Sequence, residues 1–277
     1  MRTKTFIIVA VAVLFLAASG MAYAFRGAIR DTIAIRTKPT LPAPQPYVPP
    51  AQPASEPLPV TQPTTQPTPS AQPTPVSEPT PSPEPKPVAK GINLAVPFTS
   101  QAPKADWSMP YQEACEEASL LMVNAYMTNA GAFTPDIADA QILALVEWEK
   151  NRFGYYEDTT AEEVATIARE RFGYAKSRAV KIASIDDVKA QLEKGTPVLV
   201  PAAGRLLHNP NFSGAGPLYH MLVVKGYTKD GKIITNDPGT RRGADYLYQP
   251  DVLWNALHDW NGGDVENGAK MMVVVAK

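Results

Sequence analysis

Hydrophobic and polar positions divide the chain into three parts of different character. Phe6 to Ser19 is apolar and uncharged, and Arg2 and Lys4 precede it. Pro39 to Pro87 has no recurring apolar face, whereas Lys90 to Lys277 repeats apolar positions at helical and strand spacing. We therefore expect an apolar N-terminal segment, an extended linker and one domain long enough to bury a sizeable core.

Five stretches of the domain have the apolar spacing or the end signals of helices. They are Cys115 to Asn129, Thr134 to about Arg152, Thr159 to Gly173, Ser184 to Gly195 and Pro250 to Trp260. Thr134 followed by Pro135 is a typical N-cap and first-turn pair, and Gly173 and Gly195 are typical of helix C-termini. The first of these helices is expected to be buried.

Short β-branched runs with turn residues between them predict the strands. They are "INLAVPF" at 92–98, "PVLVPAA" at 197–203, "HMLVVKGYT" at 220–228, "KIITNDP" at 232–238 and "KMMVVVAK" at 270–277. A hairpin turn is expected at Asp230–Gly231. Helices that come mostly before strands, with a hairpin among the strands, indicate an α+β domain with an antiparallel sheet.

Residues 1–25 have the order of an export signal. A basic start precedes the apolar run, and "AYA" at Ala22 to Ala24 supplies a small-x-small cleavage pattern before Phe25. Extended to Phe25, the segment has about 20 residues, the length that crosses a bilayer. It serves either as a cleaved signal peptide or as an N-terminal membrane anchor, and we favour the anchor.

Residues 26–90 predict a disordered linker, and residues 91–277 the domain that it carries. Pro39 to Pro87 holds 19 prolines in 49 residues, interleaved with Thr, Gln, Ser and Ala. This composition offers no face to bury, so it stays extended and reaches about 150 Å as polyproline II. The sequence thus predicts an extracytoplasmic protein, secreted or membrane-anchored, whose domain is held away from a surface.

Charge and ligand spacing exclude several classes of function. The net charge is −1, with acidic and basic residues mixed along the domain, which gives no basis for nucleic-acid binding. No set of His, Cys and carboxylate residues has the spacing of metal ligands, so we expect neither a metal nor a cofactor. Nothing after Phe25 approaches a membrane span, and we expect a monomer.

Cys115 is the only cysteine, and an unpaired thiol is a liability in an exported chain. It is either an inert core residue or a nucleophile. A nucleophilic thiol needs a base and a group that orients the base. Of the three histidines, His208 lies in a loop and His258 in the last helix, whereas His220 opens an apolar strand beside the loop "SGAGPLY".

Asp237 and Asn236 end the strand that is expected to pair with the strand of His220. A strict two-residue turn would place Asp237 opposite Val224, four residues from His220. A β-bulge near Gly226, together with strand coiling, is needed to bring the carboxylate to the imidazole. Asp237 is the expected orienting group and Asn236 its alternative, while Asp-Pro-Gly is also turn chemistry in its own right.

Together these motifs resemble the papain-like cysteine peptidases, and most closely family thirty-nine, the bacteriocin-processing double-glycine leader peptidases and their stand-alone relatives. The matching features are "VPFTSQ" at Val96 to Gln101, Cys115 at a helix start, "HMLVVKGY" after His220, and the Asp of "NDPG". The resemblance covers Val96 to about Gly243. It implies a papain-like fold, in which an N-terminal helical part with the nucleophile helix packs on a C-terminal antiparallel sheet.

The resemblance also implies the roles of the site residues. Cys115 would be the nucleophile, His220 the base, Asp237 the orienting group and Gln101 a donor to the oxyanion, with Gln112 the rival for that last role. The chain departs from the family where glycine usually follows the cysteine, because Glu116 and Glu117 stand there. In the first turn these carboxylates favour the helix dipole but oppose formation of a thiolate.

The expected activity is cleavage of peptide amide bonds through an acyl-enzyme, with peptides, proteins or cell-wall peptides as substrates. An amine in place of water would make the chain a transglutaminase- or transpeptidase-like acyl transferase. The alternative from a different class is a catalytically silent surface module that binds a wall or host polymer. Fast alkylation of Cys115 would indicate a live site, and slow alkylation that needs denaturant would indicate the silent module.

Overall fold

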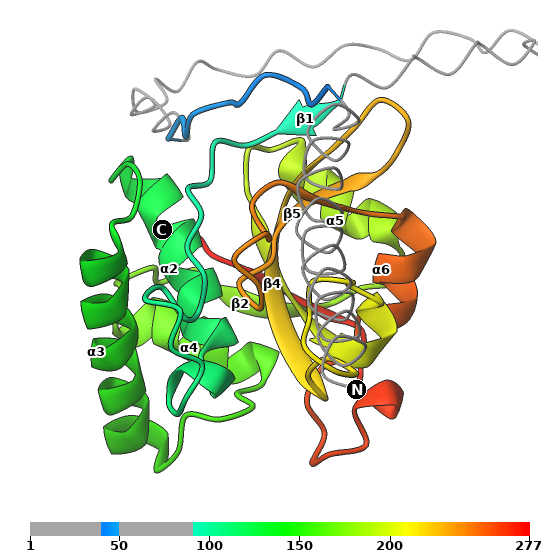
Figure 1. The fold of residues 1–277 in the computed structure, drawn as a ribbon. Helices are drawn as coiled ribbons and strands as arrows, with labels where there is room; N and C mark the ends of the chain where they lie inside the picture. The colour runs from blue at the N-terminus through cyan, green and yellow to red at the C-terminus, as the bar shows by residue number, and fades with distance from the viewer. Residues whose placement is uncertain (1–39, 50–90) are drawn as a thin grey trace, which may run out of the picture. The chain divides into compact units, whose positions relative to one another are not determined.

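The structure, a computed structural model, describes residues 40–49 and 91–277. The expected N-terminal segment and most of the expected linker lie outside these residues. The described residues from Pro42 to Lys277 belong to one unit, in which helices gather on one side of a sheet (Figure 1). The predicted α+β architecture, with helices packed on an antiparallel sheet, is confirmed.

The sheet has seven strands within the described residues, and every pairing is antiparallel. Its order is β2-β7-β3-β4-β5-β6, and β1 pairs with the far end of β4. The strands are β1 (Ile92–Asn93), β2 (Arg178–Lys181), β3 (Val198–Ala203), β4 (Tyr219–Tyr227), β5 (Ile233–Asn236), β6 (Tyr246–Tyr248) and β7 (Met271–Val274). The central strands β3 and β4 are buried at every position, which explains the apolar sequence of β3 and of residues 221–224 in β4.

The helices are α2 (Cys115–Thr128), α3 (Pro135–Phe153), α4 (Ala161–Glu170), α5 (Ile185–Leu192) and α6 (Pro250–Ala256). Three short 3-10 turns accompany them: η1 (Tyr111–Glu113), η2 (Gly204–Leu207) and η3 (Val265–Asn267). None of these described helices combines the length and the apolar character that crossing a membrane requires. The helix starts match the sequence pattern, because Thr134, Thr160 and Ser184 each cap the helix that follows.

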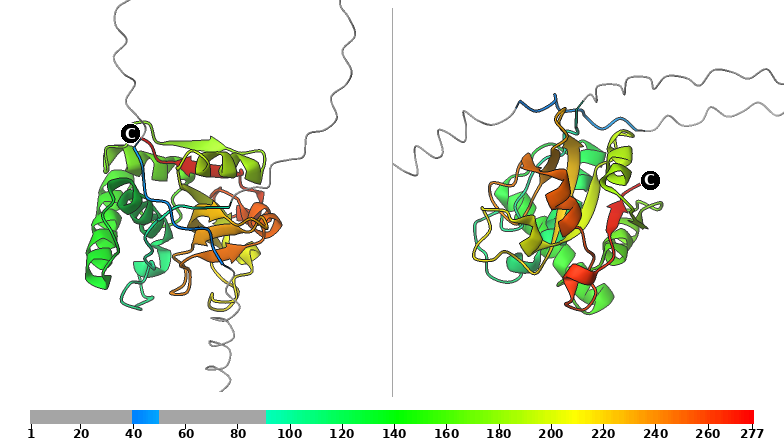
Figure 2. Two further views of the ribbon diagram at one scale, coloured as in Figure 1. Left: turned by 90° about the horizontal axis from the view of Figure 1, so that it is seen from above. Right: turned by 90° about the vertical axis from the view of Figure 1, so that its right-hand side faces the viewer.

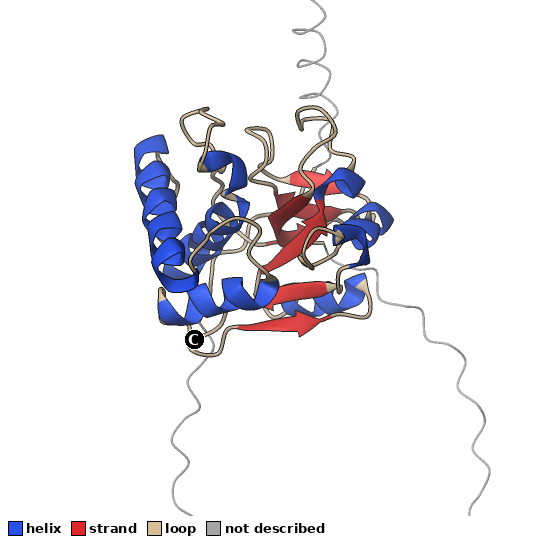
Figure 3. Ribbon diagram, turned by 90° about the horizontal axis from the view of Figure 1, so that it is seen from below, coloured by secondary structure: helices blue, strands red, loops and turns tan. Residues whose placement is uncertain are grey.

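Helix α2 lies between α3 and the sheet, so it is buried nearly all round (Figures 1 and 3). A helix enclosed in this way carries apolar residues on every face instead of one stripe. Ser119 Oγ donates to the backbone oxygen of Met221 on β4, with 3.1 Å between the oxygens. This bond fixes the height of α2 against the strand that begins with Tyr219 and His220.

Two strands were not predicted, and β1, β5 and β7 are shorter than predicted. β2 lies at the sheet edge, pairs only with β7 and is partly exposed, while β6 has three residues at the opposite edge. Such short edge strands have too few residues to show an alternating pattern. β1 has only two residues, because the chain leaves the sheet after Asn93.

The hairpin between β4 and β5 has a longer turn and a bulge, and both shift the register. Thr228 pairs with Lys232 around a three-residue loop in which Gly231 has φ 87°. A β-bulge then lies between Val224 and Gly226. Val223 therefore pairs with Asn236, and Asp237 follows next to Leu222. Since residues two apart share a face of the sheet, this register brings Asp237 to the side of His220.

Residues 42–48 at the start of the proline-rich segment pack against the domain, and we call them the strap. The backbone of Gln45 bonds to Asn93 and Ala95, each at 2.7 Å, in a parallel bridge beside β1. The ring of Tyr47 packs edge-on against Tyr126 of α2 at 5.5 Å between centroids. The expectation that the spacer packs against nothing is therefore wrong for the strap, blue in Figures 1 and 2.

Deleting residues 42–48 is expected to lower the melting temperature by roughly 3–8 °C, because the deletion removes backbone bonds and an aromatic contact. Any catalytic rate at 25 °C should stay unchanged, since the strap lines a separate pocket from Cys115. Thermal unfolding followed by circular dichroism measures the effect. Deleting residues 62–68, a segment of the same length that is also proline-containing, is the control and should leave the melting temperature unchanged. An equal shift in both variants would contradict a stabilising strap.

Candidate active site

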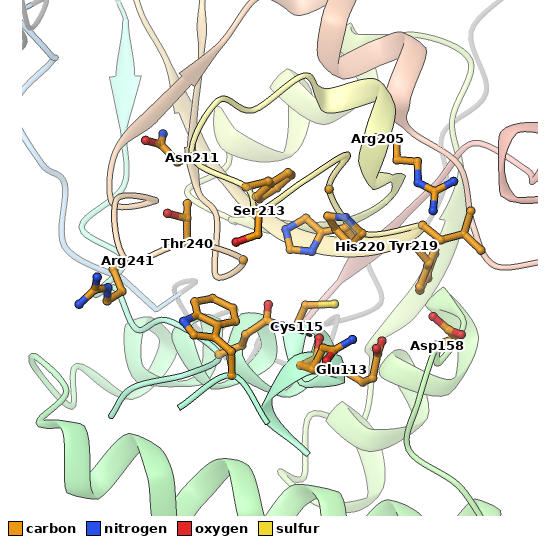
Figure 4. A pocket seen from close by; sticks show the side chains of 18 of the residues that line it. Glu113, Cys115, Asp158, Arg205, Asn211, Ser213, Tyr219, His220, Thr240 and Arg241 are labelled. Atoms are coloured by element: carbon orange, nitrogen blue, oxygen red, sulfur yellow. Dashed lines mark hydrogen bonds between the residues drawn. The ribbon is translucent and has the colours of Figure 1, made fainter. Parts of the chain in front are cut away.

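A pocket of about 1110 Å³ opens where the start of α2 faces the start of β4. Cys115 and His220 both line it, and Figure 4 shows their side chains across the pocket from each other. The chain segment before α2 also lines the pocket, through Gln101, Trp107 and Gln112. The pocket thus brings together residues from segments far apart in the sequence, around 101–115, 205–220 and 239–242.

Cys115 is the first residue of α2 and is 6% exposed. The amide N–H groups in the first turn of any α-helix lack intrahelical acceptors, so they are available to a developing negative charge. The Cys115 thiol donates to Glu116 Oε2, with 3.0 Å between sulfur and oxygen, and not to His220. Burial raises the pKa of the thiol well above its ordinary value, and the Glu116 carboxylate raises it further.

His220 and Asp237 form a buried pair. Nε2 of His220 lies 2.8 Å from Oδ1 of Asp237, and the two side chains are 1% and 0% exposed. A carboxylate only accepts hydrogen bonds, so Nε2 carries the proton in this pair and Nδ1 remains for another partner. The structure thus brings together the imidazole and the carboxylate that the sequence placed on neighbouring strands.

The carboxylate of Asp237 accepts four hydrogen bonds. His220 and the backbone N–H of Gly239 donate to Oδ1, while Asn209 Nδ2 (3.0 Å) and Tyr248 OH (2.6 Å) donate to Oδ2. Burial acts to raise the pKa of Asp237, but His220 and the hydrogen bonds outweigh it and hold the pKa below its ordinary value. Asp237 is therefore ionised and fixed in orientation.

The imidazole of His220 is enclosed by close neighbours. Phe212 meets the ring edge-on at 5.4 Å between centroids. A Cβ added at Gly239 would come within 2.8 Å of His220 Cε1, and one at Gly204 within 3.2 Å of His220 Cβ. The "DPG" glycine is thus needed for the imidazole to fit, in addition to its place in the turn.

Gln101 is buried and its amide is already engaged. Its Nε2 donates to the backbone oxygens of Tyr111 and Gln112, each at 2.9 Å. These bonds anchor η1 just before Cys115. To hold an oxyanion, the Gln101 amide has to give up one of the two bonds. Gln112 has an exposed side chain on the same pocket, so the choice between the two glutamines stays a prediction.

Asn236 binds the segment that leads to Gln101 and not the imidazole. Its Nδ2 donates to the backbone oxygens of Val96 (3.0 Å) and Pro97 (3.3 Å). The backbone N–H of Gln101 donates in turn to Pro238, at 3.1 Å. The "VPFTSQ" and "NDPG" motifs are therefore in direct contact, with Asn236 as a structural link between them.

The two glutamates after Cys115 occupy the first turn as predicted, but they are buried. Glu116 and Glu117 are 1% and 0% exposed, and Glu149 of α3 is also fully buried. Burial raises the pKa of Glu116 to about 8 and that of Glu149 to about 9, and it raises the pKa of Glu117 as well. Near neutral pH Glu116 is therefore largely uncharged, so its effect on the dipole of α2 is small.

Three residues that contact the His220–Asp237 pair could not be found from the sequence. Asn209 lies in the polar loop "HNPNFSG", where an asparagine is ordinary turn chemistry, and Tyr248 lies on the unpredicted strand β6. Phe212 carried no signal beyond its aromatic character. The other two histidines do not line the pocket, and His258 Nδ1 is engaged by the backbone oxygen of Gly268 at 2.8 Å.

Within the described residues, no three His, Cys, Asp or Glu side chains are grouped so that they could hold a metal ion.

Residues 93–261 match the Peptidase C39 like family. The chain belongs to this family. Among solved structures, it is similar to a C39-like peptidase from Bacillus anthracis, at 16% identity and a TM-score of 0.38, over 68% of this chain and 99% of that one. It is also similar to a fragment of prointerpain A from Prevotella intermedia, at 17% identity and a TM-score of 0.34, over 55% and 46% of the two chains. No curated protein matches.

Membership of the C39-like family agrees with the resemblance seen in the sequence, and it indicates a cysteine peptidase that acts on proteins or peptides. The matched range includes Gln101, Cys115, His220 and Asp237. The catalytic roles of these four residues stay predictions.

Proposed function

We propose that the chain is a thiol peptidase that cleaves peptide amide bonds through Cys115, His220 and Asp237. The observation that carries the proposal is the buried His220–Asp237 pair at the pocket that also exposes the start of α2. Burying an ionised carboxylate and an imidazole is costly unless the pair is well bonded. A silent binding module would have no need to keep such a pair beside its single thiol.

The proposed reaction begins with a proton transfer. Asp237 accepts from Nε2 of His220, so the neutral imidazole presents Nδ1 as the acceptor for the Cys115 proton. To reach it, the thiol leaves Glu116 and turns toward the imidazole. The resulting imidazolium is stabilised by Asp237, and the thiolate attacks the substrate carbonyl carbon.

The oxyanion that forms is stabilised at the start of α2. The backbone N–H of Cys115 is one donor, and the amide of Gln101 is the second once it releases one backbone oxygen. The His220 imidazolium then protonates the leaving amine and an acyl-enzyme remains. Water, activated by His220, releases the acyl group and restores the thiol.

The location of the activity is proposed from the sequence. An apolar segment ahead of a proline-rich linker would place the domain outside the cytoplasm, either secreted or anchored through residues 1–25. Substrates would then be extracytoplasmic peptides or proteins, cell-wall peptides among them, and the chain would act as a monomer.

Incubating the purified full chain with a mixed-sequence peptide library tests the proposal, with mass spectrometry to identify new termini. We expect cleavage that stops when iodoacetamide has modified one site per chain. Cys115 is the only cysteine, so the label is unambiguous. Cleavage that continues after complete labelling would assign the activity elsewhere, and absence of cleavage by the unlabelled chain would favour a silent module.

A further inference from the structure

The side chain that contacts the nucleophile most directly is an acid. Glu116 is 1% exposed, and its Oε2 accepts the hydrogen bond from the Cys115 thiol at 3.0 Å. Its other oxygen, Oε1, is buried and has no hydrogen-bond partner in the described part of the chain. A buried carboxyl group with one oxygen that accepts no hydrogen bond lowers the stability of the fold, so packing alone does not explain why an acid lies beside the thiol.

The groups that surround Glu116 make its ionised form still less favourable. The negative charges of Asp158, in the loop before α4, and Glu113 of η1 raise the pKa of Glu116. The charge of Glu116 in turn raises the pKa values of three neighbours: Glu117 of α2, Glu149 of α3 and Tyr219 of β4. All of these are acids. The hydrogen bond from Cys115 acts in the opposite direction and lowers the pKa of Glu116, but burial outweighs it.

We propose that Glu116 is a positioning residue that controls the nucleophile through its own protonation. When ionised, it holds the Cys115 thiol as a neutral donor turned away from His220. When protonated, it releases the thiol, which can then pass its proton to His220 Nδ1. The inference rests on the proposed thiol peptidase function and adds a condition under which the site is active.

The direction of the pH effect follows from the charges. Burial, with Asp158 and Glu113 adding to it, raises the pKa of Glu116 to about 8. Below that pH Glu116 is neutral and does not repel a thiolate. Above it, the carboxylate both accepts the S–H bond and disfavours a second negative charge, which is part of why the pKa of Cys115 is raised. Ionisation of Glu116 thus delays formation of the reactive thiolate, which rises less steeply with pH above about 8 than the thiolate of a free thiol.

Alkylation by iodoacetamide at pH 6 and pH 9.5 tests this in the full chain, compared with Glu116→Gln. Glutamine keeps the size of the side chain, carries no charge and can donate to a thiolate. We expect equal rates, within about twofold, at pH 6. At pH 9.5 the variant should react about tenfold faster or more, because one pKa unit on the thiol is a factor of ten. If the ratio of the variant's alkylation rate to that of the parent chain were the same at pH 6 and pH 9.5, the proposal would be overturned. A variant that reacts more slowly than the parent chain at pH 9.5 would also overturn it.

Glu117→Gln is the matched control. It neutralises the next buried carboxyl group of the same turn, which has no hydrogen bond to the thiol. Its rate ratio to the parent chain should stay within about threefold at both pH values, and an effect at pH 9.5 equal to that of Glu116→Gln would overturn the specific role of Glu116.

The parent chain itself provides a second test if Glu116→Gln does not fold. Between pH 7 and 9 its alkylation rate should rise less steeply than that of glutathione in the same buffers, and a parallel rise would contradict the proposal. Alkylation does not require peptide cleavage. A chain that cleaves no peptide but shows the pH-dependent ratio therefore overturns the proposed function alone, whereas cleavage without that ratio overturns only the role of Glu116.

Discussion

Replacing Cys115 with alanine is expected to lower peptide cleavage by at least about 10⁴-fold and to leave the melting temperature within a few degrees of the parent. The loss follows because no other thiol is present to form the acyl-enzyme. The small effect on stability follows because the change removes a single sulfur atom at the edge of a pocket. That sulfur donates to a carboxyl group that burial already keeps largely neutral, and it is also hydrogen-bonded by the backbone of Met221.

Initial rates on one cleaved library peptide, and thermal unfolding in parallel, measure the two effects. Cys115→Ser is the matched control, because it keeps the shape and a weak nucleophile and should be nearly as inactive. If the melting temperature of both variants collapsed, and their activity followed only the folded fraction, Cys115 would be a core residue and not the nucleophile.

The elements of the fold could be predicted where their own sequence fixes them. The helices that follow Thr134 and Ser184 carry caps that the structure uses. The central strands contain apolar runs, all of β3 and residues 221–224 of β4, because both of their faces are covered. The edge strands β2 and β6 could not be predicted, because pairing with a neighbour rather than local sequence makes them strands.

The candidate site, like the fold, could be predicted from the sequence only in part. The approach of Asp237 to His220 could be anticipated in outline, but it depends on a three-residue turn and on the bulge between Val224 and Gly226, which sequence alone suggests without fixing. The burial of Glu116 could not be anticipated, because an acidic residue in the first turn of a helix is usually exposed and favours the helix dipole. Only the packing of α2 between α3 and the sheet removes it from water.

The second large effect is expected at Asp237, compared with its neighbour Asn236. Asp237→Asn should lower the turnover number by roughly 10- to 10⁴-fold and change the Michaelis constant much less. An asparagine keeps the volume, but its NH₂ competes as a donor and the imidazole no longer has one fixed tautomer. Asp237→Ala should have a similar kinetic effect and a lower stability as well, since Asn209 and Tyr248 then lose a buried acceptor.

The pH dependence of the free energy of unfolding at acidic pH gives an independent measure of the contribution of Asp237 to stability. The pKa of Asp237 is held below its ordinary value in the folded chain, so the group stabilises the fold above about pH 4, and this contribution is lost as pH falls through the lowered pKa. Asp237→Asn should remove that part of the pH dependence, which urea unfolding at pH 3 to 6 can detect.

Asn236→Ala is the matched comparison, because it alters the adjacent residue of the same strand end. Asn236 donates to Val96 and Pro97 and not to His220, so its loss should loosen the segment that leads to Gln101. We expect a lower melting temperature and a fall in turnover of less than about tenfold. If Asn236 proved the more sensitive position for turnover, the contact of His220 with Asp237 would be structural. The orienting group would then be an amide, as in the Cys-His-Asn arrangement of papain-like peptidases.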